Sequence, residues 1–90
     1  MKFEWDSKKN KINKQKHGLS FEIACHVFDD PYSLIKQDEG NFDEERWQII
    51  GRINNKITVL VVFVYKNEQE ENIRIISARL ATSYERRQYE

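Results

Sequence analysis

The spacing of apolar residues changes along the chain from a helical period to a strand period. The helical spacing i, i+3, i+4, i+7 is formed by Phe21, Ala24, Cys25 and Phe28. Such a stripe is typical of one face of a helix. Ser20 precedes it as a favoured N-cap residue, and an Asp-Asp-Pro run follows it. We therefore expect a helix that begins after Ser20 and ends at this run.

A second helix, very polar, is expected over residues 7–17. Asp6 is a candidate N-cap and Gly18 a natural left-handed stop. The only large apolar residue is Ile12, which at 100° per residue shares a face with Lys9, Asn13 and Lys16. Burial cannot be the main force that holds such a helix. Either its lysine stems lie along an apolar surface, or this face meets a polar partner.

From residue 46 onward the apolar period becomes two, which indicates strands. We expect strands over residues 46–53, 57–65 and 73–79, shorter strands over 2–5 and 32–36, and loops over 37–45 and 66–71. Thr82 and Glu85 have the spacing of a capping box that begins a C-terminal helix. The order predicts an α+β fold with two N-terminal helices, an antiparallel sheet of three to four strands and a C-terminal helix.

Turn geometry then predicts which side chains share a face. A two-residue turn at Asn54-Asn55 places Arg46 opposite Phe63. Pairing Lys66 with Ile73 places Arg74 opposite Tyr65 and Arg79 opposite Leu60. On this register one face carries Arg46, Gln48, Tyr65 and Arg74, and the other carries Trp47, Ile49, Leu60, Val62, Lys66 and Arg79.

Length and composition exclude several classes of protein. Ninety residues, 39% of them hydrophobic, indicate one domain over residues 1–90 and exclude a disordered segment. The single cysteine, Cys25, excludes a disulfide framework and a cysteine-based zinc site. No apolar run approaches the roughly 18 residues that span a membrane. We expect a cytoplasmic protein without a cofactor.

The net charge of zero hides a segregated pattern. Six lysines face two acids in residues 1–20, while one lysine faces eight acids in residues 21–45. Residues 46–66 hold four cations and no acid, and residues 74–90 hold four arginines against two acids. If these three basic segments converge, they form a surface that suits a polyanion. The alternative is a solvated surface with interspersed ion pairs.

Two arginines lie inside an apolar strand, where a charge is costly unless it is paired or hydrated. Arg74 stands in the run NIRII and Arg79 in IISARLA. The structural alternative for each is a salt bridge to an acid such as Glu22 or Glu85. The functional alternative is a phosphate contact in a groove.

An ordered set of short motifs extends over essentially the whole chain. It comprises Phe3-Glu4-Trp5-Asp6, Lys9, Asn13, Lys16-His17-Gly18, Ser20-Phe21-Glu22, Ala24, Val27-Phe28-Asp29-Asp30-Pro31, Glu45-Arg46, Ile50-Gly51-Arg52, Arg74-Ile75-Ile76-Ser77-Ala78-Arg79, Ala81-Thr82, Glu85-Arg86-Arg87 and Tyr89-Glu90. The set resembles the BrnT family, the toxin half of a bacterial type II toxin–antitoxin pair.

The resemblance implies a RelE-like fold and a ribonuclease that arrests translation. It also implies a BrnA-like antitoxin with a ribbon–helix–helix DNA-binding part as the partner, and contact with operator DNA only through that complex. The family often has a Thr-x-Arg at the end of the central strand, where this chain reads Val64-Tyr65-Lys66. Lysine keeps the charge but loses the bidentate fork that suits phosphate oxygens.

Metal-free RNA cleavage needs a base, an acid and cations around the phosphate. His17 is the first candidate, because histidine is the residue type best suited to proton transfer near neutral pH. The alternative is a histidine at a helix C-terminus whose positive form interacts favourably with the helix dipole. Lys16 or Lys66 is a further candidate base, if clustered cations favour the neutral form of its amine. Arg79 is the candidate for stabilising the phosphorane. The candidate RNA-backbone contacts are Lys9, Lys16, Arg46 and Arg74.

The competing hypothesis is a non-catalytic module that uses the same fold to bind an antitoxin and aid repression. Direct binding of DNA by the free chain is a third, weaker hypothesis.

Overall fold

A five-stranded mixed sheet forms the centre of the molecule. The computed structural model describes residues 1–40, 44–67, 69 and 72–90. The strand order is β1-β5-β4-β3-β2, and the strands are β1 (Lys2–Glu4), β2 (Leu34–Asp38), β3 (Arg46–Ile53), β4 (Ile57–Tyr65) and β5 (Asn72–Leu80). The helices are α1 (Ser7–His17), α2 (Phe21–Ala24) with its 3₁₀ continuation η1 (Cys25–Asp29), and α3 (Ser83–Tyr89). Parts of the two expected loops, residues 41–43, 68 and 70–71, lie outside the described residues.

The α+β class is confirmed, but the predicted sheet was too small and wholly antiparallel. The N-terminal strand β1 pairs in parallel with β5, with Phe3 opposite Ile73. The physical reason is burial: the rings of Phe3 and Phe28, with centroids 5.2 Å apart, are partly buried and pack against the apolar core between sheet and helix. Because β1 and β5 are far apart in the sequence and pair in parallel, no hairpin turn connects them, and the local sequence pattern does not reveal the pairing.

The helix predicted after Ser20 consists of an α-helical part and a 3₁₀ part. The hydroxyl of Ser20 caps α2 by accepting from the amide of Ile23 at 3.2 Å, as the sequence indicated. From Cys25 the backbone tightens into a 3₁₀ helix that ends at Asp29. A 3₁₀ helix has three residues per turn, so Ala24 and Val27 lie on the same side and both are fully buried.

The predicted faces of the sheet were partly wrong, because each connection differs by one residue from the expected register. Asn54 and Asn55 both have positive φ, as a tight turn requires, but Ile53 pairs with Ile57 and so Trp47 lies opposite Phe63. Between β4 and β5, Arg79 lies opposite Leu60 as predicted. A bulge near Val62 then places Arg74 opposite Val64 instead of Tyr65.

These shifts regroup the side chains. Tyr65 joins Trp47 on the core face, with ring centroids 5.7 Å apart. Arg74 and Arg79 lie together on the opposite face. A bulge adds one unpaired residue to a strand without changing its hydrophobic character, so alternation alone does not predict it.

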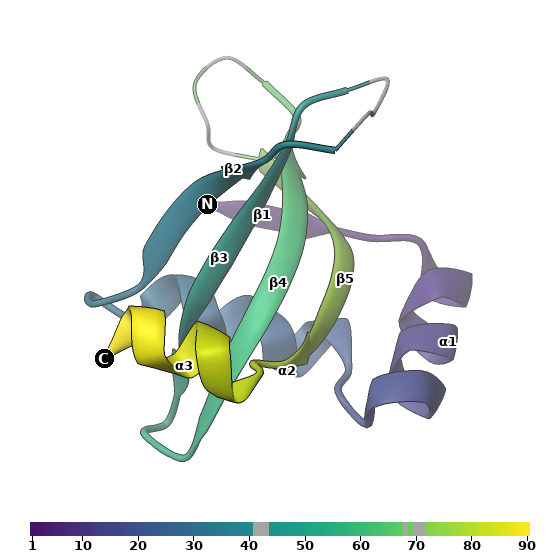
Figure 1. The fold of residues 1–90 in the computed structure, drawn as a ribbon. Coiled ribbons are helices and arrows are strands. Elements are labelled where there is room, and N and C mark those ends of the chain that lie inside the picture. The colour runs from purple at the N-terminus through teal and green to yellow at the C-terminus, as the bar shows by residue number, and fades with distance from the viewer. Residues whose placement is uncertain (41–43, 68, 70–71) are drawn as a thin grey trace.

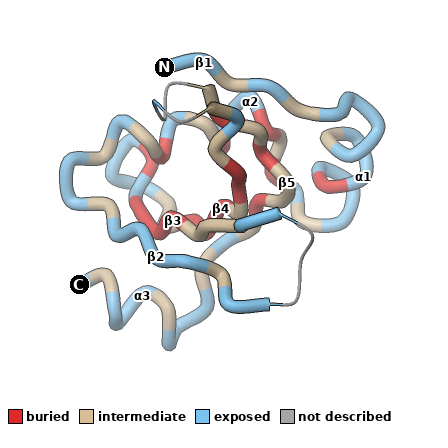
Figure 2. Tube along the Cα trace, turned by 90° about the horizontal axis from the view of Figure 1, so that it is seen from above, coloured by how far each residue is buried: buried red, intermediate tan, exposed pale blue. Residues whose placement is uncertain are grey.

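Helices cover the two faces unequally, as Figure 1 shows. Behind the sheet, α2 and η1 enclose the core, in which Phe21, Val27 and Phe63 are fully buried. In front, α3 crosses only the lower part, and α1 stands beside β5. Figure 2 shows the buried residues concentrated along the central strands and α2. None of the helices in the described ranges is long and apolar enough to cross a membrane.

Candidate nucleic-acid interface

The front face of the sheet carries the two arginines that the sequence singled out. We define the open face as the side of β3, β4 and β5 that bears Gln48, Val62, Arg74 and Arg79. The partners of the two arginines on β4, Val64 and Leu60, are four residues apart, which corresponds to roughly 13 Å along a strand. The arginines therefore hold two separate points on this face and do not meet at one atom.

Arg79 is fixed by a carboxylate from α3. Its Nη1 and Nη2 atoms donate to Oε1 and Oε2 of Glu85 at 2.7 and 2.9 Å, a fork-to-fork geometry, and Nη1 also donates to the carbonyl of Leu80 at 3.2 Å. The hydrogen bond from Arg79 lowers the pKa of Glu85 to about 2, and the same bond raises that of Arg79. The structural alternative for Arg79 is thus realised, with Glu85 as the acid.

The same ion pair leaves part of the guanidinium available. An arginine has five N–H donors, and within the described part of the chain three of those of Arg79 have acceptors. The Nε–H and one Nη2–H remain, and 36% of the side chain is exposed. Because Glu85 holds the group in one orientation, these two donors form a preorganised contact for an anion.

The polar helix α1 is attached beside Arg79 by one buried side chain. Nδ2 of Asn13 donates to the carbonyls of Ala78 and Leu19 at 2.7 and 2.9 Å, and its Oδ1 accepts from the amide of Ala78 at 3.2 Å. Asn13 is 7% exposed, and α1 buries no apolar residue. The helix therefore meets a polar partner, the backbone of β5, which was one of the two options that its sequence left open.

This attachment brings three of the predicted site residues towards Arg79. At 100° per residue, Lys9, Lys16 and His17 all lie within about 60° of Asn13 on the helix. They therefore flank the side chain that bonds to Ala78, the residue before Arg79. His17 is half-buried, whereas the two lysines are exposed. The structure thus gathers Arg79, His17, Lys9 and Lys16 along one edge of the open face.

The other three predicted residues lie at the opposite end of the sheet. Arg74 forms an ion pair with Glu44 and lies opposite Val64, and Arg46 begins β3, one residue before the partner of Phe63. Lys66 follows the last residue of β4, and its amide donates to the carbonyl of Asn72 at 2.8 Å. Lys66 lies six residues, or roughly 20 Å, along the chain from Leu60, the residue opposite Arg79 on β4. Lys66 is therefore not brought into the same centre as Arg79 and His17.

Sequence reasoning missed the role of Asn13 and the carboxylate Glu44. Asn13 was noticed only as a member of a lysine-rich helix face. The available signal was that a helix with a single large apolar residue needs a polar contact to hold it, and the amide of Asn13 can both donate and accept hydrogen bonds. Glu44 gave no signal, because its pairing with Arg74 depends on how the chain returns between β2 and β3.

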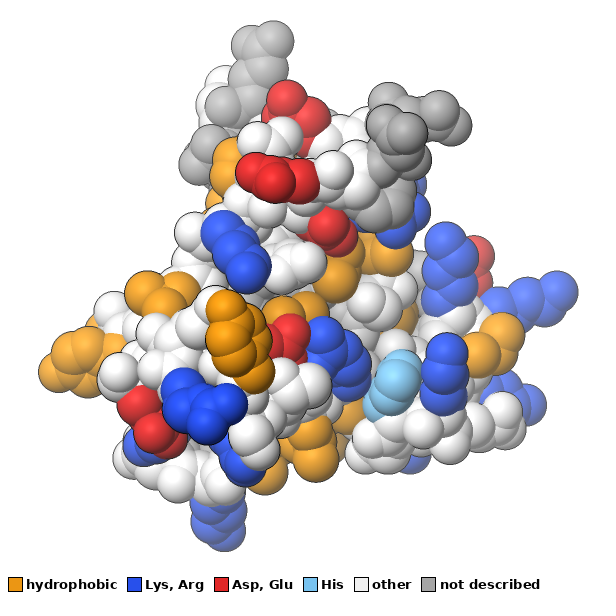
Figure 3. Space-filling model, viewed as in Figure 1, with side chains coloured by type: hydrophobic (Ala, Val, Ile, Leu, Met, Phe, Trp, Pro, Cys, Tyr) orange, Lys and Arg blue, Asp and Glu red, His pale blue; other side chains and the backbone are white. Residues whose placement is uncertain are grey.

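The charged side chains are distributed unevenly over this side of the molecule (Figure 3). Lysine and arginine side chains gather along α1 and around α3, and acidic side chains gather towards the upper end of the sheet. The basic segments at the N-terminus and in residues 74–90 therefore converge partly, at the edge that carries Arg79. The described residues contain no group of three or more His, Cys, Asp or Glu side chains that could hold a metal ion.

Comparisons with known proteins agree with this architecture. The family model described as the ribonuclease toxin BrnT of type II toxin–antitoxin systems matches residues 5–85. The crystal structure of the Brucella abortus ribonuclease toxin BrnT is 30% identical in sequence, with a TM-score of 0.64, and the match covers 92% of this chain and 99% of that one. No curated protein gives a significant match. The chain therefore belongs to the BrnT family of ribonuclease toxins of type II toxin–antitoxin systems, in which an antitoxin is the partner.

Proposed function

We propose that the protein is a cytoplasmic endoribonuclease that cuts RNA without a metal ion, arrests translation and is neutralised by a BrnA-like antitoxin. The observation that carries the proposal is the position of Arg79. Its guanidinium is held by Glu85, keeps two N–H donors available, and lies next to the helix that bears His17. A cation fixed beside a titratable group is the minimum machinery for transphosphorylation of RNA.

In this mechanism the RNA supplies its own nucleophile. The 2′-hydroxyl oxygen attacks the adjacent phosphorus, the bond to the 5′ oxygen breaks, and the products are a cyclic phosphate and a free 5′-hydroxyl. His17 either takes the proton from the 2′-hydroxyl or gives one to the leaving 5′ oxygen, and solvent water takes the other role. Arg79 donates to the non-bridging oxygens, where negative charge grows in the transition state.

The remaining cations bind the RNA chain on either side of the reacting phosphate. Lys9 and Lys16 extend along α1 beside Arg79, and Arg74, Arg46 and Lys66 lie towards the far end of the open face. Since roughly 13 Å separates Arg74 from Arg79 along β5, the two contact different phosphates. Lys66 then contacts a phosphate of the RNA chain instead of acting as a catalytic base.

RNA cleavage in EDTA tests this proposal. We expect the purified free protein to cleave RNA with EDTA present, and Arg79→Ala to lower kcat by about 100-fold or more, as removal of one transition-state donor does. Arg79→Lys should restore only part of the rate, because lysine lacks the fork that Glu85 orients. Lys11→Ala is the matched control, because Lys11 is an exposed cation on the outer side of α1. A folded Arg79→Ala protein that cleaves at the wild-type rate would refute this site.

The neutralising partner is tested separately. We expect a small neighbouring gene to encode a protein with a ribbon–helix–helix part, whose co-expression relieves growth arrest. That complex, and not the free toxin, should bind operator DNA.

A second candidate function is a non-catalytic module that binds the antitoxin and aids repression. The observation in its favour is that carboxylates already pair with two arginines of the open face, Arg79 with Glu85 and Arg74 with Glu44. This candidate predicts a stable complex with the antitoxin and no cleavage of any RNA by the free chain.

A further inference from the structure

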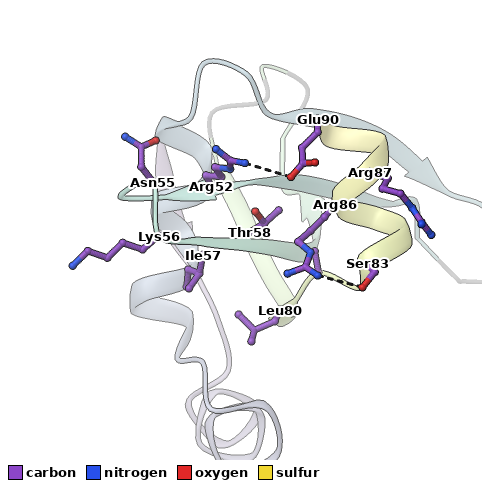
Figure 4. A pocket seen from close by; sticks show the side chains of 11 residues that line it. Arg52, Asn55, Lys56, Ile57, Thr58, Leu80, Ser83, Arg86, Arg87 and Glu90 are labelled. Carbon is purple, nitrogen blue, oxygen red and sulfur yellow. Dashed lines mark hydrogen bonds and ion pairs between the residues drawn. The ribbon is translucent and has the colours of Figure 1, made fainter.

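A second basic surface lies between α3 and the lower end of the sheet (Figure 4). It is a pocket of about 580 Å³ between α3, the end of β5 and the turn that joins β3 to β4. Four cations line it, Arg52, Lys56, Arg86 and Arg87, against one acidic side chain, Glu90. We call it the α3 pocket.

The cations of the α3 pocket are poorly matched by the protein itself. Within the described ranges, Lys56 and Arg87 have no side-chain partner, and Arg86 donates only to the hydroxyl of Ser83, at 3.2 Å. Arg52 lies 3.5 Å from Glu90, at the limit of a hydrogen bond. On the open face, by contrast, Arg74 and Arg79 each have a close carboxylate partner. The unmet charge of the pocket points to an anionic ligand.

The α3 helix separates this pocket from Arg79. Glu85 and Tyr89 lie on the side of the helix that faces the sheet, where they bond to Arg79 and to Asp30. At 100° per residue, Arg86 and Arg87 are turned roughly 100° and 160° away from Glu85. A ligand in the pocket therefore reaches α3 from the side opposite the proposed catalytic arginine.

The apolar part of the pocket distinguishes between two kinds of anion. Leu80 is 54% exposed and lines the pocket together with Ile57. An RNA backbone offers phosphates but no aliphatic group to cover an exposed leucine, whereas an acidic peptide offers both carboxylates and apolar side chains. Arginine forks bind carboxylates in the same bidentate manner as phosphates. The combination of unmatched cations and an apolar wall therefore favours a peptide.

We propose that the α3 pocket binds an acidic segment of the antitoxin that also carries an apolar side chain. The carboxylates of that segment pair with Lys56, Arg86 and Arg87, and its apolar side chain covers Leu80. This inference rests on the proposed function in one respect, namely that an antitoxin holds this chain. It adds a location and a chemistry for the contact, on the other side of α3 from Arg79.

The experiment compares two triple variants in antitoxin binding and in RNA cleavage. The pocket variant is Lys56→Ala/Arg86→Ala/Arg87→Ala, and the control is Lys8→Ala/Lys11→Ala/Lys14→Ala, which removes the same charge from exposed positions of α1. The probe is the purified antitoxin encoded beside the toxin gene, titrated at low and high salt. We expect the pocket variant to bind at least about tenfold more weakly and with a shallower salt dependence. The control should bind within about twofold of wild type.

RNA cleavage by the free variants provides the second readout. We expect the pocket variant to keep kcat and KM within about twofold of wild type, since the pocket is not part of the proposed catalytic machinery. A raised KM would overturn the inference in favour of an RNA subsite. Unchanged antitoxin affinity would overturn it as well. If the wild-type chain self-associates in a salt-dependent manner and the pocket variant does not, the pocket binds a second copy of the chain instead.

A single substitution guards against loss of folding in the triple variant. Leu80→Asp removes the exposed apolar contact and adds a repelling charge, and it should weaken antitoxin binding by a similar factor while thermal unfolding stays cooperative. Wild-type binding of Leu80→Asp would overturn the apolar part of the inference. If the wild-type toxin does not bind the antitoxin, both this inference and the proposed partner are overturned. If the wild-type toxin binds and the pocket variant binds equally well, only this inference is overturned.

Discussion

The helices α1 and α2 follow each other in sequence but are attached to the sheet by opposite means. With η1, α2 is held by burial: Phe21, Ala24 and Val27 are fully enclosed against the sheet. By contrast, α1 contributes no buried apolar side chain, and the amide of Asn13 joins it to the backbone of β5 through two hydrogen bonds to Ala78 and donates a third to the carbonyl of Leu19.

The difference matters because the two forces have different directionality. Hydrophobic burial stabilises a helix against a face but is non-directional. Hydrogen bonds to two atoms of one residue fix both the position and the rotation of a helix. The polar attachment of α1 therefore sets where His17 and Lys16 stand relative to Arg79, while α2 and η1 mainly supply stability. The third helix, α3, resembles α1 in burying no apolar residue, and its main links to the sheet are polar.

The largest effect is expected for Phe21→Ala, which removes the anchor of α2. Phe21 is fully buried and its ring lies 6.2 Å from that of Trp5, so truncation leaves a cavity and costs about 3–5 kcal/mol of unfolding free energy. Urea denaturation measures it. Ile12→Ala is the matched control on α1, because Ile12 is 61% exposed, and it should change stability by less than about 0.5 kcal/mol. Equal losses in the two variants would contradict the contrast between the helices.

An intermediate effect is expected for Asn13→Ala, which breaks the attachment of α1. The amide and carbonyl of Ala78 and the carbonyl of Leu19 lose their bonds to Asn13 in a buried site, which costs about 2–3 kcal/mol. RNA cleavage should fall further than the unfolded fraction explains, because α1 no longer positions His17. Denaturation and cleavage rates measured on the same preparation separate these two losses. A variant that keeps full activity would show that α1 is positioned by other contacts.

The smallest effect is expected for Glu85→Gln, which weakens the link between α3 and Arg79. Because the Arg79–Glu85 pair is partly exposed, solvent screening limits the loss of unfolding free energy to about 1 kcal/mol at neutral pH. The pKa of Glu85 falls from an ordinary 4.5 to about 2 in the folded protein. A lowered carboxyl pKa contributes stability above the unfolded value, and this contribution is lost as the pH falls towards the folded one.

The pH dependence gives that prediction its direct check. The difference in stability between wild type and Glu85→Gln should be constant above about pH 5 and should shrink between about pH 4.5 and pH 2. Thermal unfolding across this range measures it. A difference that persists unchanged at pH 2 would mean that Glu85 acts through the capping of α3 and not through its charge.

The amino-acid sequence by itself determined which helices and strands form and where the helices begin, although the strand expected over residues 32–36 lies at Leu34–Asp38. The caps at Asp6, Ser20 and Thr82 and the turn at Asn54-Asn55 lie where predicted, because caps and turns depend on residues a few positions apart. The motif order also predicted the family correctly. The ion pair between Arg79 and Glu85 was foreseen as an option, since six residues separate the two side chains.

Only the tertiary structure decided how distant segments meet. The parallel pairing of β1, the bulge near Val62 and the bonds from Asn13 to Ala78 join residues far apart in the chain or shift a register by one. These features separated Lys66 from Arg79 and assembled the α3 pocket from three elements. Local periodicity cannot contain them, because the free energy that selects them arises from packing and hydrogen bonds that exist only once the sheet has formed.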